Sequence, residues 1–328
     1  MKKCAPLWLV IAADILLTGV ILCVFALFHH VIPSMEARRS AESSVSTASP
    51  APTAAPAAGA ASEDGRTEWQ IRFAEHFTEE TVRTENSYSS PNISVTIEEK
   101  STVIRNHTTV YYVADVYVGS IECLRTYTAH GTYSYMAAEN LMDMDAAVNP
   151  IFAVSGDYAT VQRGGFIVRN GELCSDGVPK CDICVLYADG RMATYAEGEY
   201  VIEDILADGP LQVWNFGPAL LDASGRVKES YDTSVAVSYP NPRSAVGYYE
   251  PGHYCFIVAD GRQGDYSYGL RLKELAAIFR KLGCKAAYNL DGGGSAVMIF
   301  NHEICSSRSN GDRELGDIIY LAEPEGTE

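Results

Sequence analysis

Apolar and polar positions along the chain form a pattern that predicts mostly β-structure. Apolar residues alternate or run unbroken through Ile93 to Ile97 and Val110 to Val118, as in half-buried and buried strands. Three dipeptides typical of hairpins or turns separate other apolar runs: Asn170-Gly171, Asp189-Gly190 and Pro251-Gly252. Two segments have the pattern of short helices: Tyr135 to Met144 and Val201 to Leu206.

The C-terminal part of the chain changes from strand to helix and back to strand. Cys255 to Ala259 is an apolar run, and Ala286 to Leu290 is another. Between them, residues 269–283 place apolar side chains at helical spacing, and Gly283 follows as a helix cap. This order predicts a βαβ-like unit at 255–300, whose two strands are parallel. The expected fold class is α+β, or mixed α/β, with a β-rich sheet core.

Acidic residues follow both strands of this unit. Asp260 comes directly after the first, and Asp291 follows the second. The carboxyl ends of parallel strands lie on one edge of a sheet, where ligands bind in open α/β folds. Gly292, Gly293 and Gly294 come next, and consecutive glycine amides can form a concavity that holds an anion. An ordinary glycine-rich turn is the alternative, whereas a nucleotide-binding phosphate loop is disfavoured because no Lys follows.

Two more segments place polar side chains at strand ends. Arg243 follows Pro242 at the start of an apolar run, where a guanidinium could bind two phosphate oxygens or could simply be a surface cation. Asp157 follows the apolar run Ile151 to Val154 in a Gly-Asp pair, which on its own is more often a turn. Arg262, two residues after Asp260, adds a second arginine to the predicted edge.

Taken together, these segments resemble the phosphodiester glycosidase family. The resemblance covers roughly residues 110 to 322 and includes Gly316 to Tyr320, which is similar to the closing strand of the family. Ser155 to Tyr158 departs from the family, because many relatives carry Asn-Gly-Gly-Phe there. Five motifs occur in the order of the family: Gly156-Asp157-Tyr158, Gly217-Pro218-Ala219-Leu220, Pro242 through Gly247, Asp260-Gly261-Arg262, and Asn289 through Ser295.

The resemblance implies a hydrolase that releases a sugar from a phosphodiester attached at its anomeric carbon. Asp291 is then the first candidate for nucleophile or base, with Asp260 or Asp157 as its acid/base partner. Whether the reaction retains or inverts configuration depends on the separation of the carboxylates, which the sequence does not give. The candidate substrate-binding residues are Arg243, Arg262, Asn289, Gly292, Gly293, Gly294 and Ser295.

The N-terminal region indicates a membrane-attached protein. Residues 5–28 are almost entirely apolar and long enough to cross a hydrocarbon core of about 30 Å. A signal anchor preceded by a cytoplasmic tip of residues 1–4 is favoured over a cleaved signal peptide, because the apolar run exceeds the usual length. Residues 29–68 are rich in Ser, Ala and Pro, which predicts a disordered stalk. The extracytoplasmic domain is expected at 69–328.

Charge and cysteine content limit the partners. The formal net charge of −17 argues against nucleic acid and other polyanions bound through long-range attraction. Seven cysteines follow residue 28, so not all of them can pair within one chain; a local bridge from Cys174 to Cys181 or Cys184 is conceivable. No histidine or cysteine spacing indicates a metal site, so no cofactor is expected, and a structural divalent cation is left open.

Three functions are compatible with this layout. The favoured function is an anchored hydrolase acting on an envelope polysaccharide or glycoconjugate. The alternatives are a non-catalytic module that binds phosphosugar or cell-wall glycan, and an assembly protein for exopolysaccharide.

Overall fold

Most of the chain past the N-terminal region is described by a computed structural model, which covers residues 65–161, 164–307 and 313–324. The described residues contain three sheets and belong to one compact unit of the chain. The predicted anchor at 5–28 and nearly all of the predicted stalk lie outside the described residues. Thr67 and Glu68, which the sequence assigned to the stalk, instead cap and begin helix α3 (Glu68–Arg72). Within the described ranges, no helix is long and apolar enough to span a membrane.

Sheet one has seven strands, and every pairing in it is antiparallel. In spatial order they are β1 (Val82–Arg83), β2 (Ser87–Ser89), β3 (Ile93–Ile104), β4 (His107–Val118), β13 (His253–Ala259), β12 (Arg243–Glu250) and β14 (Ala286–Asn289). Strands β3 and β4 include the two runs predicted from the sequence but extend well beyond them, because Arg105 and Asn106 form a tight turn with φ of 53° and 65°.

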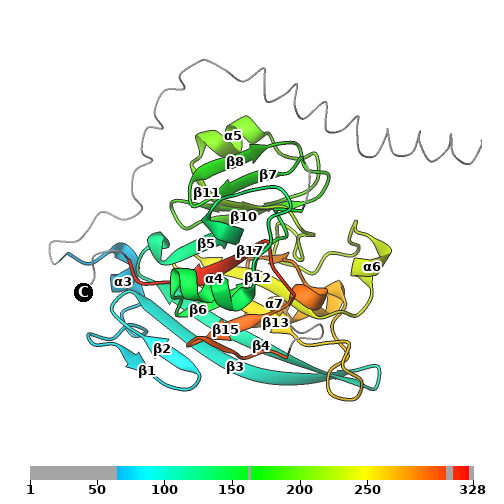
Figure 1. Cartoon of the computed structure of the whole chain (residues 1–328), viewed down its shortest axis with the longest axis horizontal. Coiled ribbons are helices and arrows are strands. Elements are labelled where there is room, and N and C mark those ends of the chain that lie inside the picture. Colours follow the sequence, from blue (N-terminus) through cyan, green and yellow to red (C-terminus); the bar gives the residue numbers. More distant parts are fainter. Residues whose placement is uncertain (1–64, 162–163, 308–312, 325–328) are drawn as a thin grey trace, which may run out of the picture. The chain divides into compact units, whose positions relative to one another are not determined.

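Sheets two and three have five strands each, and Figure 1 shows sheet two beside β5 and β17 of sheet three. Sheet two, in order, is β10 (Met192–Tyr195), β9 (Ile183–Tyr187), β11 (Pro210–Trp214), β7 (Phe166–Arg169) and β8 (Glu172–Asp176). Sheet three is β16 (Glu303–Ile304), β15 (Met298–Phe300), β6 (Phe152–Ser155), β17 (Asp317–Leu321) and β5 (Leu124–Thr128). All three predicted turn dipeptides are confirmed, since each joins two paired strands.

The remaining elements are short, apart from one helix. They are α4 (Leu141–Val148), α5 (Ile202–Ala207), α6 (Val235–Ser238), α7 (Leu272–Leu282), and the 3₁₀ turns η2 (Ile121–Cys123), η3 (Ala129–Gly131) and η4 (Gly293–Ser295). The predicted helix at Tyr135 to Met144 is wrong in its first half: the side chain of Asn140 accepts from the Met142 amide and starts α4 there. The helix predicted at Val201 to Leu206 is confirmed as α5.

Sheet one is packed on both faces. One face joins a large apolar core that includes side chains of sheet three; Phe152 and Phe256, for example, lie with ring centroids 5.4 Å apart. On the other face, α7 buries Leu275, Ala276 and Phe279 against Ile257 and its neighbours. Because α7 connects β13 to β14, burial of its apolar face also holds these two strands, which precede the candidate acids Asp260 and Asp291.

The predicted βαβ-like unit is confirmed, with one strand inserted. Strands β13 and β14 both run antiparallel to β12, which lies between them, so β13 and β14 are parallel to each other. Helix α7 connects them and ends at Gly283, whose φ of 91° is left-handed as the sequence predicts. The carboxyl ends of β13 and β14 therefore lie on one edge, together with the start of β12.

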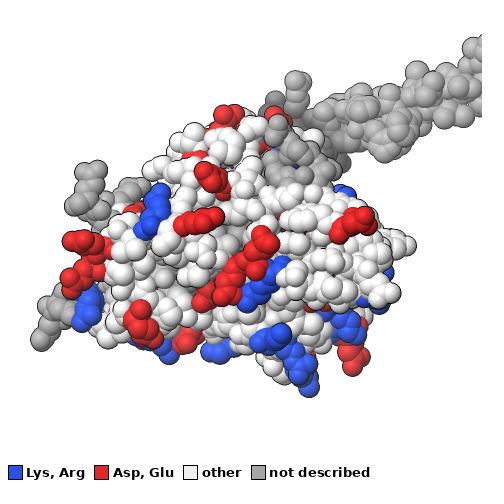
Figure 2. Space-filling model, turned by 90° about the horizontal axis from the view of Figure 1, so that it is seen from below, with Lys and Arg blue, Asp and Glu red and all other residues white. Residues whose placement is uncertain are grey.

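All seven described cysteines are free thiols, so the conceivable bridge from Cys174 to Cys181 or Cys184 is not formed. Cys181 donates instead to the carbonyl of Asn215, at 2.9 Å, and Cys184 is buried in strand β9. On the face of the molecule in Figure 2, acidic and basic side chains are interspersed. That face offers no continuous basic surface to a polyanion.

Candidate active site

The register of sheet one brings the motifs together. Arg243, the first residue of β12, pairs with Ala259 on β13, and Ala245 pairs with Asn289 on β14. The chain segments that begin at Asp260 and at Asp291 therefore leave the sheet on either side of Arg243. Because neighbouring strands are about 4.8 Å apart, these two segments start roughly 10 Å from each other. That gap is wide enough to leave a small cavity at the edge.

A cavity of about 160 Å³ opens at this edge. Its walls are Phe216, Ala236, Val237, Asn241, Arg243, Arg262, Asp291, Gly292, Gly293, Gly294 and Arg313. The structure thus brings together one predicted carboxylate, both predicted arginines and the three glycines. Four other candidates do not line the cavity: Asp157, Asp260, Asn289 and Ser295. Phe216 and Arg313 were not predicted, because neither belongs to a motif with recognisable spacing.

Asp291 is the carboxylate of the cavity, and its backbone is tied to sheet three. Its amide donates to the carbonyl of Gly156, at 2.9 Å, and the hydroxyl of Ser155 donates to its carbonyl, at 3.0 Å. Burial raises the pKa of Asp291 to about 6, and the charge of Asp157 acts in the same direction, while Ser295 and Arg313 oppose the shift. Asp291 is therefore largely ionised at neutral pH and takes up a proton in mild acid.

The glycines allow a close approach but supply fewer free amides than the sequence suggests. A Cβ atom on Gly292 would lie 2.7 Å from the carbonyl oxygen of Pro242. Gly293 has a φ of 61°, and its amide donates to the same oxygen at 2.9 Å, so it is not available to a ligand. Among the described residues, Gly294 has no acceptor for its amide. The amide of Gly292 donates to the carboxylate of Asp291. The predicted concavity of three amides is therefore corrected to one that offers the Gly294 amide.

Arg243 is a buried cation that lines the cavity. Its side chain is 3% exposed, and its Nε donates to the carbonyl of Leu270 at 2.8 Å. Its Nη2 donates to the carbonyls of Val237 at 2.6 Å and Tyr239 at 2.8 Å, which leaves Nη1 without an acceptor in the described part of the chain. Burial lowers the pKa of Arg243 to about 10, with a contribution from Arg262, so it remains charged at neutral pH.

The cation of Arg243 therefore needs an anion. Within the described ranges no carboxylate forms an ion pair with it, and its partners are carbonyl groups. An unpaired buried charge is costly, and the two N–H groups of Nη1 are left to donate to an oxyanion. Arg262 adds a second cation at the mouth: it is exposed, donates twice to Asn241 Oδ1 at 3.1 and 2.6 Å, and lies against Gly293.

Asp260 lies near the site but acts on the surrounding loops. It is 1% exposed and accepts from the hydroxyl of Tyr266 at 3.0 Å and from the amide of Ser307 at 2.9 Å. Burial raises its pKa to about 6 in spite of these bonds. Asp260 thus holds the Asp-Gly-Arg loop, which carries Arg262, against the segment after β16.

Asp157 is part of a buried charge network that the sequence analysis missed. Arg169 donates through Nη2 to Asp157 and to Asp317, the latter at 2.9 Å, and all three side chains are at most 4% exposed. The amide of Asp157 also donates to Asp317, at 3.1 Å. A Cβ atom on Gly156 would lie 2.3 Å from the Asp317 carboxylate, which explains the glycine before Asp157. The sequence did contain one signal of this network: Arg169 is the last residue of the apolar strand β7, and Asp317 is the first residue of the apolar strand β17.

Asn289 and Ser295 support the cavity from behind. The side-chain Nδ2 of Asn289 donates to the carbonyl of Gly217 at 2.8 Å, and the backbone N–H of Asn289 donates to the carbonyl of Pro218 at 3.2 Å. These bonds hold the Gly-Pro segment that follows Phe216, the aromatic wall of the cavity. Ser295 is 1% exposed and lies beside Asp291. Both residues are therefore placed to position the site rather than to touch a ligand.

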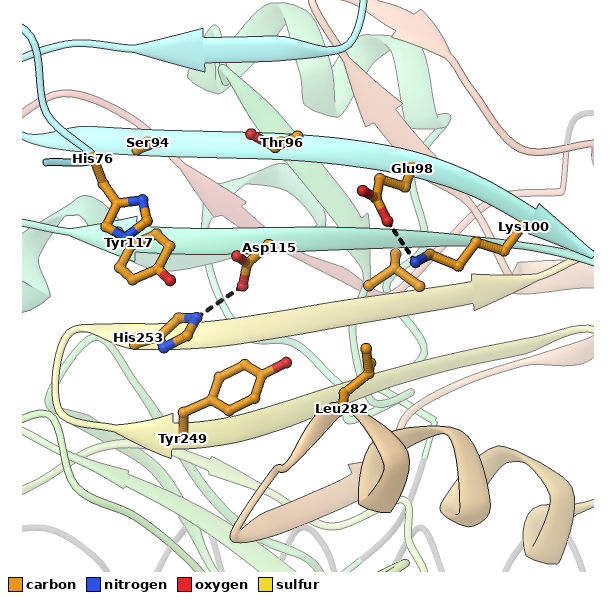
Figure 3. A pocket seen from close by; sticks show the side chains of 11 residues that line it. His76, Ser94, Thr96, Glu98, Lys100, Asp115, Tyr117, Tyr249, His253 and Leu282 are labelled. Atoms are coloured by element: carbon orange, nitrogen blue, oxygen red, sulfur yellow. Dashed lines mark hydrogen bonds and ion pairs between the residues drawn. The ribbon is translucent and has the colours of Figure 1, made fainter. Parts of the chain in front are cut away.

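A larger depression lies on the outer face of sheet one and has different chemistry (Figure 3). Its volume is about 450 Å³. The rings of four residues stack in a row along it, with neighbouring ring centroids 3.6 to 4.0 Å apart: His76, Tyr117, His253 and Tyr249. Its charged groups satisfy each other, since His253 bonds to Asp115 at 2.8 Å and Lys100 pairs with Glu98. None of the five sequence motifs lines it. We therefore place the candidate active site at the smaller cavity.

Known proteins resemble this chain in sequence. The phosphodiester glycosidase family profile matches residues 148–322, more than half of the chain. The N-acetylglucosamine-1-phosphodiester alpha-N-acetylglucosaminidase of Mus musculus is 26% identical over 204 residues, covering 52% of this chain and 39% of the mouse protein. The SPbeta prophage-derived uncharacterized protein YomE of Bacillus subtilis is 26% identical over 204 residues, covering 59% of this chain and 32% of YomE. The chain thus spans about a third of the length of these curated relatives.

Solved structures share the fold. The catalytic domain of zebrafish N-acetylglucosamine-1-phosphodiester alpha-N-acetylglucosaminidase, auto-inhibited by its pro-peptide, superimposes with a TM-score of 0.60 at 19% identity, over 75% of this chain and 88% of that one. A hypothetical protein from Synechocystis gives a TM-score of 0.53 at 14% identity, over 71% and 62%. The chain carrying this cavity belongs to the phosphodiester glycosidase family.

Proposed function

We propose that this protein hydrolyses a sugar-1-phosphodiester, releasing the sugar and leaving a phosphomonoester. One observation carries the proposal. Among the described residues, a single carboxylate, Asp291, shares a cavity of about 160 Å³ with Arg243, whose buried charge has no carboxylate partner there. The mouse and zebrafish relatives are named for this reaction on N-acetylglucosamine.

The chemistry of the leaving group fits a site with few acids. A phosphodiester oxygen departs as a stabilised anion, so it needs cations and N–H donors more than a proton. Arg243 Nη1, Arg262 and the Gly294 amide are the groups we assign to the phosphate. In this assignment they face the negative charge that grows as the bond to the anomeric carbon breaks.

Asp291 is assigned to the attack on the anomeric carbon. Glycosidases that form a covalent intermediate use a second carboxyl group about 5 Å away as acid and base. Asp157 and Asp260 are both buried, and their carboxylates accept hydrogen bonds from other groups. Neither residue lines the cavity. We therefore favour direct displacement, in which Asp291 deprotonates the attacking water and the configuration at the anomeric carbon is inverted.

Replacement of Asp291 by Asn tests the assignment. The purified protein is assayed on a panel of α-linked sugar-1-phosphodiesters, beginning with N-acetylglucosamine, and released sugar is measured. Loss of general-base catalysis should lower kcat by about 10²-fold or more. The matched control is Asp143→Asn, an exposed position in the first turn of α4. Turnover by Asp291→Asn equal to that of the wild type would remove this residue from the mechanism.

Two further readouts separate the alternatives. NMR of the first sugar released shows its anomeric configuration, and retention would replace direct displacement by a covalent intermediate. Binding of the phosphodiesters without turnover by the wild type would support a glycan-binding module, which the same cation-lined cavity could also serve.

The location of the protein is also part of the proposal. We infer that an N-terminal signal anchor at 5–28 holds the domain outside the cytoplasm, facing a phosphodiester-linked envelope polysaccharide or glycoconjugate. The length and apolar character of that segment support the inference. Protease treatment of intact cells tests it: the domain should be digested from outside, and full protection would contradict an extracytoplasmic domain.

A further inference from the structure

A second cavity, of about 500 Å³, lies where sheets two and three meet. Strands β5 and β17 supply one side, and the hairpin β7–β8 and the loop 131–133 supply the rest. Its size falls within the range of about 300 to 1,000 Å³ that is usual for ligand pockets. None of the predicted site residues lines it.

Two polar atoms beside this cavity are buried without partners. Thr126 Oγ1 and Arg169 Nε have no hydrogen-bond partner among the described residues, and their side chains are 3% and 4% exposed. Both residues line the cavity. Buried polar groups in folded proteins are nearly always paired, so each unpaired one indicates a missing partner such as a ligand or water. Both atoms are themselves covered, so the groups that a ligand in this cavity can reach are the hydroxyls and rings of the lining.

The charge of the cavity excludes an anionic ligand. Arg169 is its only described arginine or lysine, and both Asp157 and Asp317 oppose that charge at close range. Glu172 adds a negative charge at the rim. The described lining therefore keeps no positive charge to attract a phosphate, in contrast to the cavity around Arg243.

The rest of the lining suits a sugar. Thr128 and Thr132 offer hydroxyl groups, and Tyr127 and Tyr133 combine an apolar ring with a polar tip. Neither Thr132 nor Tyr133 uses its hydroxyl in a bond to another described residue. Hydroxyl groups beside aromatic rings match the alternating polar edges and apolar C–H faces of a pyranose.

We propose that this cavity is a second binding site, specific for an uncharged sugar unit. Arg169 links it to the candidate active site, because it donates to Asp157, and the preceding residue, Gly156, accepts from the amide of Asp291. The sugar is assigned to the same glycan that carries the scissile phosphodiester. That assignment rests on the proposed function, whereas the binding itself does not.

Binding is tested on the full-length Asp291→Asn protein, which keeps turnover out of the measurement. The probes are N-acetylglucosamine, its dimer and its trimer, with N-acetylglucosamine 6-phosphate as the charged counterpart, titrated by calorimetry. The double variant Thr132→Val/Tyr133→Phe removes two hydroxyls with little change of shape. The matched control is Thr108→Val/Tyr111→Phe on strand β4 of sheet one.

The uncharged probes should bind, and the cavity variant should weaken that binding at least about tenfold while the control leaves it unchanged. Absence of binding by all uncharged probes, equal binding in both variants, or tighter binding of the phosphate at this cavity would each overturn the proposal. In the active protein, the cavity variant should raise KM for a phosphodiester on a trisaccharide but not for one on a single sugar. If the wild-type protein turned over none of the phosphodiesters but the uncharged probes still bound, only the proposed function would be contradicted.

Discussion

Arg243 owes its importance to what surrounds it. A lysine would keep the charge but could not reach the three carbonyls that the guanidinium binds while also presenting Nη1 to the cavity. The residue is therefore both a structural donor and the candidate anion ligand. Its substitution should affect stability and turnover together, unlike that of a residue with only one of these roles.

We expect Arg243→Lys to lower kcat/KM by at least about 10²-fold and the free energy of unfolding by about 1–3 kcal/mol, because the carbonyls of Leu270, Val237 and Tyr239 each lose one donor. Urea unfolding and steady-state kinetics measure the two effects. Arg105→Lys, at the exposed turn between β3 and β4, should change neither. Full activity in Arg243→Lys would show that a guanidinium is not required at this position.

The pKa of Asp291 sets the pH dependence expected for catalysis. Because burial raises this pKa to about 6, the base form is lost below that pH. We predict that kcat/KM rises with pH through an acid limb near 6 and then levels off. Asp260 also has a pKa of about 6, but it does not line the cavity. Asp260→Asn should therefore retain the limb, and a limb that disappears in this variant would assign it to Asp260.

At the scale of elements, the turn after β14 determines the shape of the cavity. Gly292 passes so close to Pro242 that a methyl group would meet its carbonyl oxygen at 2.7 Å. Backbone on both sides leaves no flexible side chain to move aside. The turn would have to shift away from β12, and Asp291 and the Gly294 amide would shift with it.

Gly292→Ala should therefore lower kcat/KM by about 10²-fold, since a displacement of about 1 Å in a catalytic group has effects of this size. Gly171→Ala is the control: its φ of 84° makes alanine strained, but nothing lies within 4 Å of the added atom. The control should lose about 1 kcal/mol of stability and keep its activity. Equal loss of activity in both variants would indicate general destabilisation instead.

Local signals explain why some elements could be predicted from the sequence. The turns at Asn170-Gly171 and Asp189-Gly190 depend on dipeptides that favour left-handed backbone, and the end of α7 depends on Gly283. The order of strand, helix and strand likewise implied that Asp260 and Asp291 share an edge. These features need no knowledge of distant segments.

Contacts between distant segments explain what could not be predicted. The Gly293 amide is taken by Pro242, about 50 residues earlier, so the number of free amides was overestimated. Asp157 was a candidate acid, but its partners Arg169 and Asp317 come from two different sheets and bury it. Periodicity indicates which face of a strand is buried, but it does not show which charges meet there.

At the scale of the whole molecule, several buried carboxyl groups share an unusual property. Burial raises the pKa of Asp260 and Asp291 to about 6, and burial together with Asp157 raises that of Asp317. The folded protein therefore binds protons more tightly than the unfolded chain at these positions. The high net negative charge of −17 acts in the same direction, because protonation reduces repulsion in the compact state.

Stability should consequently fall as pH rises from about 4 to about 7, between the unfolded pKa values and the folded ones. A group whose folded pKa lies above its unfolded value stabilises the protein fully at low pH, and this contribution is lost as pH passes through the folded pKa. For Asp260, a rise from 3.8 to about 6 corresponds to at most about 3 kcal/mol. Calorimetry should give a higher unfolding temperature at pH 5.5 than at pH 8. Asp260→Asn should flatten this dependence, whereas Asp143→Asn should not. An unfolding temperature that rises toward pH 8 would mean that these carboxyl groups are ionised in the fold at no cost.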